Sequence, residues 1–103
     1  MNAQDEMQLR SESSRGQRAV ELMEDELIVE AFSILEQRFM TEWAASPARD
    51  TEGRERIWVM QKLLGNLKAH LLEVATTGKL ASLQLEQNRT KVQRAKEWLT
   101  EQF

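Results

Sequence analysis

The chain of 103 residues contains no cysteine, no tyrosine, one proline and four glycines. Without cysteine it can form neither a disulfide framework nor a thiolate metal site. Because proline and glycine interrupt secondary structure most strongly, their scarcity favours long helices. Strands are not indicated, since the sequence has none of the alternating apolar and polar runs that half-buried strands show. These absences predict an all-α fold.

Long apolar runs are also missing. No stretch approaches the roughly 20 apolar residues that cross a bilayer, and residues 1–15 mix acids with bases, unlike a secretory signal. Hydrophobic residues make up 41% of the chain and charged residues 30%, which is lean in apolar and rich in charged residues for a globular domain. We therefore expect no membrane partner, and either an elongated bundle or a protomer whose core a partner completes.

The net charge of −3 conceals an uneven distribution. Residues 1–46 carry ten acids and four bases, residues 47–78 four acids and five bases, and residues 79–103 three acids and five bases. The acidic first part is expected to attract the basic later parts, within one chain or between chains. The chain as a whole lacks the strong basic excess of a typical nucleic-acid-binding domain.

The spacing of apolar residues predicts three helices, at about 18–45, 51–77 and 80–102. They are expected to form one helical domain over residues 16–103, as an antiparallel hairpin with a third C-terminal helix in a three-helix or oligomeric bundle. Residues 1–15 have few apolar side chains and no sustained period, which predicts a flexible polar tail. The alternative for this segment is a frayed extension of the first helix.

The first predicted helix carries two adjacent apolar rows at spacings of three and four. One row contains Val20, Met23, Leu27, Ala31 and Ile34, and the other contains Ile28, Phe32, Leu35, Phe39 and Trp43. A face this wide predicts contact with more than one neighbouring element. Ser46-Pro47 ends the helix, and Asp50 and Thr51 are candidates to cap the next one.

The second predicted helix has a regular seam. It contains Ile57, Met60, Leu64, Leu67, Leu71 and Val74, in a heptad pattern. The core of the hairpin is predicted to contain Phe32, Phe39, Leu64, Leu67 and Leu71. Trp43 and Trp58 flank the turn and are predicted to close that end of the hairpin together. Gly65 suggests a close approach of another helix, and Gly78 is predicted to be the left-handed residue that stops the helix.

The third predicted helix has a narrower apolar face. Leu85, Val92 and Leu99 are spaced by seven, and Asn88 lies at an intermediate seam position, where a polar residue can fix register. This helix is expected either to pack on the hairpin or to pair with another copy. We predict a protein interface made by Leu85, Val92, Trp98 and Leu99.

Catalytic and metal-binding patterns are missing. His70 is the one histidine, and although Glu73 follows it on the same face, no second histidine or Glu-x-x-His motif supports a metal or acid–base site. The serines lack a Gly-x-Ser-x-Gly context. We therefore predict no catalytic residue, metal, cofactor or small-molecule substrate.

A basic run near the end of the chain offers an alternative function. It comprises Lys79, Arg89, Lys91, Arg94 and Lys96. Such side chains supply affinity for phosphates without choosing a base sequence, so a nucleic-acid-binding accessory remains a second hypothesis. The preferred interpretation is a solvated helix that meets the acidic first helix.

The middle of the chain, over roughly residues 24–85, resembles small helical proteins encoded in tailed-bacteriophage and prophage genomes. The residues that carry the resemblance are Trp43, Ser46, Gly53, Arg54, Glu55, Trp58 and the run Thr77-Gly78-Lys79-Leu80-Ala81. The resemblance implies a phage-related origin and a role in head assembly or DNA packaging, in the bacterial cytoplasm or the virion. It implies no catalytic residues.

Taken with the surplus of apolar rows, these patterns predict a non-enzymatic helical assembly protein. It is expected to self-associate or to dock on another protein, since an oligomer covers the apolar rows more completely than a monomer does.

Overall fold

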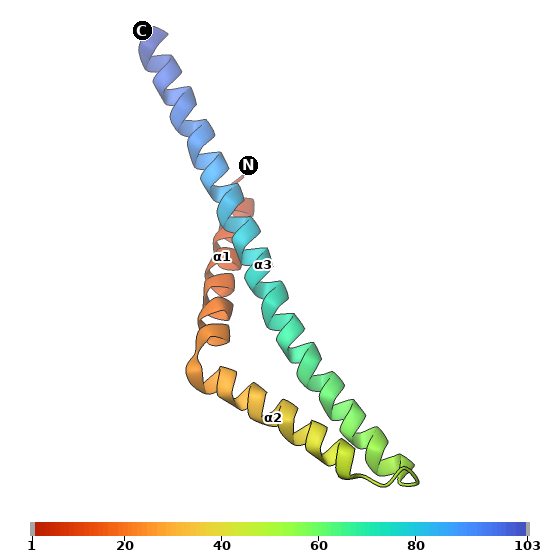
Figure 1. The fold of residues 1–103 in the computed structure, drawn as a ribbon. Coiled ribbons are helices and arrows are strands. Elements are labelled where there is room, and N and C mark those ends of the chain that lie inside the picture. Colours follow the sequence, from red (N-terminus) through yellow and green to blue (C-terminus); the bar gives the residue numbers. More distant parts are fainter. Residues whose placement is uncertain (1, 103) are drawn as a thin grey trace. The chain divides into compact units, whose positions relative to one another are not determined.

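The computed structural model describes residues 2–102, which form three α-helices (Figure 1). α1 spans Ala3–Glu24, α2 spans Glu26–Ala45 and α3 spans Thr51–Gln102. The described residues contain no strand. The predicted all-α fold class is therefore confirmed.

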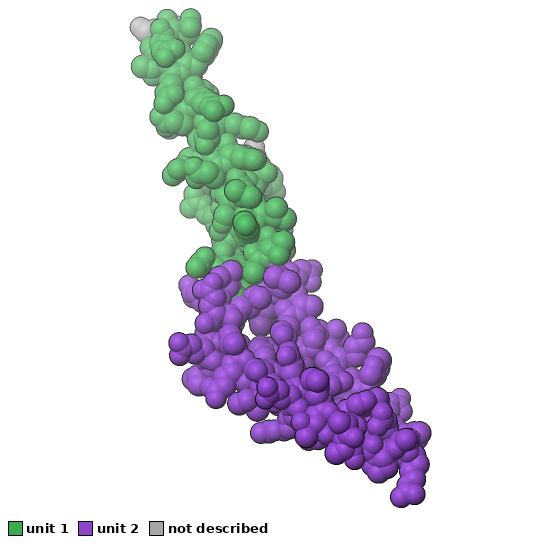
Figure 2. All heavy atoms as spheres, viewed as in Figure 1, with its two compact units in different colours: residues 1–19, 74–103 green, residues 20–73 purple. Residues whose placement is uncertain are grey.

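The helices are divided between two compact units, where the sequence predicts one domain over residues 16–103. The first unit combines the chain up to Ala19 with the chain from Val74 onward, and the second contains Val20–Glu73 (Figure 2). The division arises because α3 contacts α1 in the first unit and α2 in the second. Each unit is thus a separate pairing of helices.

The predicted flexible tail over residues 1–15 is helical from Ala3 onward. The helix is capped at its start, because the Asn2 side-chain oxygen accepts a hydrogen bond from the backbone nitrogen of Asp5 at 2.8 Å. Asp5 and Glu6 add negative charge to the first turn, where the helix dipole favours it. A hydrogen-bonded ion pair of 2.7 Å joins Glu6 to Arg10 one turn later.

The predicted single helix over residues 18–45 is interrupted at Asp25. This residue has an extended backbone, with φ −64° and ψ 126°, and its Oδ1 accepts hydrogen bonds from the backbone nitrogens of Leu27 and Ile28. Asp25 therefore caps α2, because its carboxylate satisfies donors that the helix itself leaves unpaired. The apolar periodicity continues across the break, which is why it predicts one helix.

The predicted break at Ser46-Pro47 is confirmed, since α2 ends at Ala45. The Ser46 hydroxyl donates a hydrogen bond to the Trp43 carbonyl at 2.7 Å. Asp50 then caps α3, and its carboxylate accepts from the backbone nitrogen of Gly53 at 3.1 Å.

The predicted stop at Gly78 does not occur, and α3 runs through it to Gln102. No glycine in the described part of the chain has a positive φ. Gly78 is instead helical and buried, so its missing side chain serves packing. The separate helices predicted at 51–77 and 80–102 are one helix.

Within the second unit, α2 and the first part of α3 run in opposite directions. The guanidinium of Arg54 lies 3.8 Å from the centre of the Trp43 ring, and farther from the turn Lys68 Nζ lies 2.7 Å from Glu36 Oε1. Of the predicted core, four residues are half-buried there: Phe32, Phe39, Leu64 and Leu71.

Two residues predicted to lie inside this pairing are solvent-exposed. Leu67 is 52% exposed, so it is not part of the core. Trp58 is also 52% exposed, and its ring lies 5.8 Å from Lys62 Nζ on the same helix. The turn is closed by Arg54 on Trp43 rather than by the two tryptophans, because a guanidinium both stacks on the ring and bonds the helix end.

Replacing Arg54 with alanine is expected to lower the free energy of unfolding of the second unit by about 1–2 kcal/mol. Its Nη1 donates to the carbonyl oxygens of Trp43 and Ser46, each at 3.2 Å, and to Ser46 Oγ at 2.8 Å. Urea denaturation followed by circular dichroism measures the loss. The matched control is Arg56→Ala at an exposed position of the same helix, and equal losses for both variants would contradict the role of Arg54.

Candidate assembly surfaces

The closest contact in the first unit is a crossing of two glycines. A Cβ atom placed on Gly16 would lie 2.5 Å from the Cα of Gly78 and 3.1 Å from the carbonyl oxygen of Val74. A Cβ placed on Gly78 would meet Gly16 in the same way and would lie 2.8 Å from the Glu12 carbonyl oxygen. Two helix backbones can approach this closely only where both residues lack side chains.

Small residues extend this crossing one turn in each direction. Ala19 and Ala81 are the buried apolar side chains of residues 2–102, at 3% and 2% exposure. Ala19 lies on one side of the crossing, and Ala81 lies on the other side together with Ser13 and Ser82, whose hydroxyls form a hydrogen bond of 2.5 Å. The spacing Ser13-x-x-Gly16-x-x-Ala19 places all three on one side of α1. This pattern was the missed signal that residues 3–19 pack on α3.

The seam of α3 continues past the part that α1 covers. Along this face Gly78 and Ala81 are buried and Leu85 is half-buried, whereas Val92 is 55% and Leu99 49% exposed. A spacing of seven residues keeps these last three on one face, with a drift of about 20° per heptad. Trp98, 60% exposed, lies beside the seam. Three of the four predicted interface residues are thus exposed on one stretch of α3.

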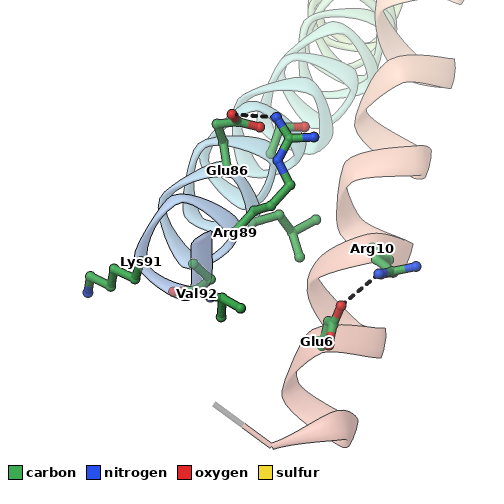
Figure 3. A pocket seen from close by; sticks show the side chains of 9 residues that line it. Glu6, Arg10, Glu86, Arg89, Lys91 and Val92 are labelled. Atoms are coloured by element: carbon green, nitrogen blue, oxygen red, sulfur yellow. Dashed lines mark hydrogen bonds and ion pairs between the residues drawn. The ribbon is translucent and has the colours of Figure 1, made fainter. Parts of the chain in front are cut away.

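A shallow groove of about 720 Å³ lies where α1 gives way to the open seam. Figure 3 shows that its two ion pairs each stay within one helix, Glu6 with Arg10 on α1 and Glu86 with Arg89 on α3. Lys91 points away from α1. The groove therefore presents charged groups and an apolar floor, without a set of polar groups converging on one point.

The basic run predicted as a nucleic-acid site lies entirely on α3 but does not form one face. At about 100° per residue, Lys91 and Lys96 are separated by about 140° around the helix. Arg89 and Lys96 lie on one side of the exposed seam and Lys91 on the other, while Lys79 and Arg94 lie toward the back of the helix. The structure thus flanks the Val92–Leu99 seam with bases instead of gathering them into a phosphate-binding patch.

α2 presents a second exposed apolar face. On α2 the two apolar rows of the sequence prove unequal: Ile28, Phe32, Leu35 and Phe39 are half-buried, while Leu27, Ala31 and Ile34 are exposed, Leu27 at 74% and Ile34 at 42%. Exposed Glu30 lies beside this outer row. Residues 20–37 contain six acids and no base, so the surroundings of this face are acidic.

The second unit has an apolar pocket of about 280 Å³ between α2 and α3. Met23 of α1, Phe32 of α2 and Leu71 of α3 line it, together with the Glu36–Lys68 ion pair. His70 is exposed on α3 and does not line it. Within residues 2–102, no group of three histidine or acidic side chains is placed to hold a metal ion.

None of the helices in the described stretch combines the length and apolar character that a bilayer crossing requires. In comparisons with known proteins, no protein-family model, no curated protein and no solved structure matches this chain. The resemblance to tailed-phage proteins therefore stays a prediction from the sequence.

Proposed function

We propose that this chain is a non-enzymatic helical protein that assembles with further copies of itself. The observation that carries the proposal is the exposure of its apolar side chains. Eighteen large apolar side chains are exposed within residues 2–102, whereas the buried apolar side chains are two alanines. When a partner covers this much apolar surface, the free energy of the system falls, because the apolar side chains are removed from water.

The total surface area supports the same proposal. The chain exposes 8653 Å², whereas a compact monomer of 12.0 kDa exposes about 6,000 Å². The surplus of about 2,700 Å² per chain comes to roughly 5,300 Å² for two chains, at the upper end of the about 2,000–5,000 Å² that permanent homodimers bury in total. Self-association therefore offers enough area for a stable interface.

A nucleic-acid-binding accessory is the weaker candidate. It is favoured by residues 87–96, which contain four bases and no acid. Phosphate contacts are strongest at low ionic strength, so a titration of the chain with duplex DNA at about 50 mM salt tests this candidate. Absence of binding under these conditions would eliminate it. The phage resemblance implies a role in virion assembly. That role is compatible with self-association, but the resemblance assigns it no particular residue.

The association of purified chain is expected to depend on its concentration. Light scattering between about 1 and 100 μM should show the average mass rising above the 12.0 kDa of the single chain, because mass action drives apolar faces together. The mass is expected to fall when urea is added below the unfolding midpoint. A mass that stays at one chain throughout this range would refute the proposal.

A further inference from the structure

The charges beside the open seam of α3 determine what can cover it. Lys91 lies on one side of Val92 and Leu99, and Arg89 and Lys96 lie on the other. When two helices pair through a heptad seam, the residues flanking the seam meet across the interface. If this stretch paired with the same stretch of another copy, in either direction, bases would face bases. Like charges at these positions oppose association, so the seam favours an acidic occupant.

The chain itself carries an acidic helix with an uncovered apolar row. On α2, Leu27 and Ile34 form the exposed row, and Glu26 and Glu30 lie along one side of it. The lone base on this face is Arg38, one turn beyond Ile34. The two faces therefore match: each presents exposed aliphatic side chains seven residues apart, and their flanking charges have opposite sign.

We propose that copies of this chain join head to tail, with the Val92–Leu99 seam of α3 in one copy lying on the Leu27–Ile34 row of α2 in the next. This inference rests on the proposed self-assembly and names the two surfaces that make it. The occupant is a second copy because the same chain carries both complementary faces, and because pairing of the basic seam with itself is electrostatically unfavourable.

Head-to-tail joining has consequences that a symmetric dimer lacks. Each copy uses two different faces, so a copy bound through one face still offers the other, and growth continues until a ring closes or a filament forms. Added salt screens the attraction between the exposed charges, over a Debye length of about 10 Å at 0.1 M. Assemblies larger than dimers that shrink as salt is raised are the expected behaviour.

Charge reversal on each face separately tests the pairing. The seam variant carries Lys91→Glu and Lys96→Glu, and the row variant carries Glu30→Lys and Gln37→Lys, which leave Glu26 in the first turn of α2 unchanged. Each variant alone would have two faces of like charge, so its association is expected to weaken by about tenfold or more. An equimolar mixture of the two variants is expected to associate again, because each seam then meets a row of opposite sign.

The matched control is Lys79→Glu with Arg94→Glu. It changes the net charge as much as the seam variant does, but at positions about 140° and 160° away from the seam around α3. Its association is expected to equal that of the unmodified chain. Circular dichroism verifies that every variant keeps its helical content.

The outcomes separate the two proposals. An unmodified chain that never associates overturns the proposed self-assembly. A chain that associates, but whose seam or row variant associates equally well, leaves self-assembly standing and overturns the pairing of these two faces. Weakened variants that fail to recover on mixing also overturn the head-to-tail pairing, since its defining feature is that one copy's seam meets another copy's row.

Discussion

Replacement of Gly78 by leucine is expected to separate α1 from α3 in the first unit. Any Cβ at this position would lie 2.5 Å from the Cα of Gly16 and 2.8 Å from the Glu12 carbonyl oxygen, and the atoms it meets are backbone, which cannot rotate away. The helices would have to move apart, which opens the Ser13–Ser82 hydrogen bond and exposes Ala19 and Ala81. The cost is about 3 kcal/mol of unfolding free energy for this pairing.

The direction of this effect runs against helix propensity. Leucine is the better helix former by almost 1 kcal/mol, so α3 itself is expected to keep its helical content while α1 loses protection. Hydrogen exchange measured by mass spectrometry on peptides from residues 3–19 should rise toward the rate of an unfolded chain, and peptides from α2 should be unaffected.

The control is Gly65→Ala in the same helix. A Cβ at Gly65 meets no atom within 4 Å, so alanine there is expected to stabilise α3 by up to about 1 kcal/mol. Of these two substitutions in one helix, Gly78→Leu is thus expected to destabilise the structure and Gly65→Ala to stabilise it. If Gly78→Leu were as harmless as Gly65→Ala, the glycine crossing would not hold α1 in place.

This crossing marks the limit of what apolar periodicity predicts. The turn at Ser46-Pro47 and the Asp50 cap follow from proline geometry and capping chemistry. The spacing predicts the apolar row from Ile28 to Phe39, although not which of the two rows is buried. An apolar period is recognised from large apolar side chains. α1 instead packs through glycine, alanine and serine, which contribute almost nothing to such a pattern. For the same reason, the sequence predicts a helix end at Gly78 and does not reveal that this glycine packs against another helix.

The interruption at Asp25 was missed for a different reason. Four acids stand close together at residues 21–26, and all of them suit the first turn of a helix. Asp25 is the cap because its side chain accepts hydrogen bonds from the backbone nitrogens of Leu27 and Ile28. Charge alone does not distinguish a capping carboxylate from its neighbours, since that distinction depends on backbone conformation.

The sequence predicts an apolar seam on the last part of α3, but it predicts no exposed apolar face on α2. A spacing of seven identifies Val92 and Leu99 directly, and their exposure agrees with a free seam. On α2 the sequence shows two apolar rows of similar strength, and nothing in their spacing tells which one packs on α3. That assignment depends on how α2 is rotated about its axis, which a pair of alanine substitutions measures.

Phe32→Ala is expected to change the folding equilibrium and Leu27→Ala the association equilibrium, although the two residues are little more than one turn apart. Phe32 is half-buried against α3 and lies 5.8 Å from Lys68 Nζ. Its truncation removes part of a large apolar contact, so the free energy of unfolding should fall by about 2 kcal/mol. Leu27 is 74% exposed, so its truncation should change this free energy by less than about 0.5 kcal/mol.

The association of copies should respond in the opposite way. In the proposed pairing, the Leu27 side chain is removed from water only when a second copy lies on α2, so alanine there should raise the dissociation constant for association by about tenfold. Urea denaturation in dilute solution isolates the first equilibrium, and light scattering at high concentration measures the second. Equal destabilisation of the dilute chain by both variants would mean that α2 is rotated differently. A stable Leu27→Ala chain that associates normally would instead place the interface elsewhere, because truncation of a side chain that an interface buries must weaken association.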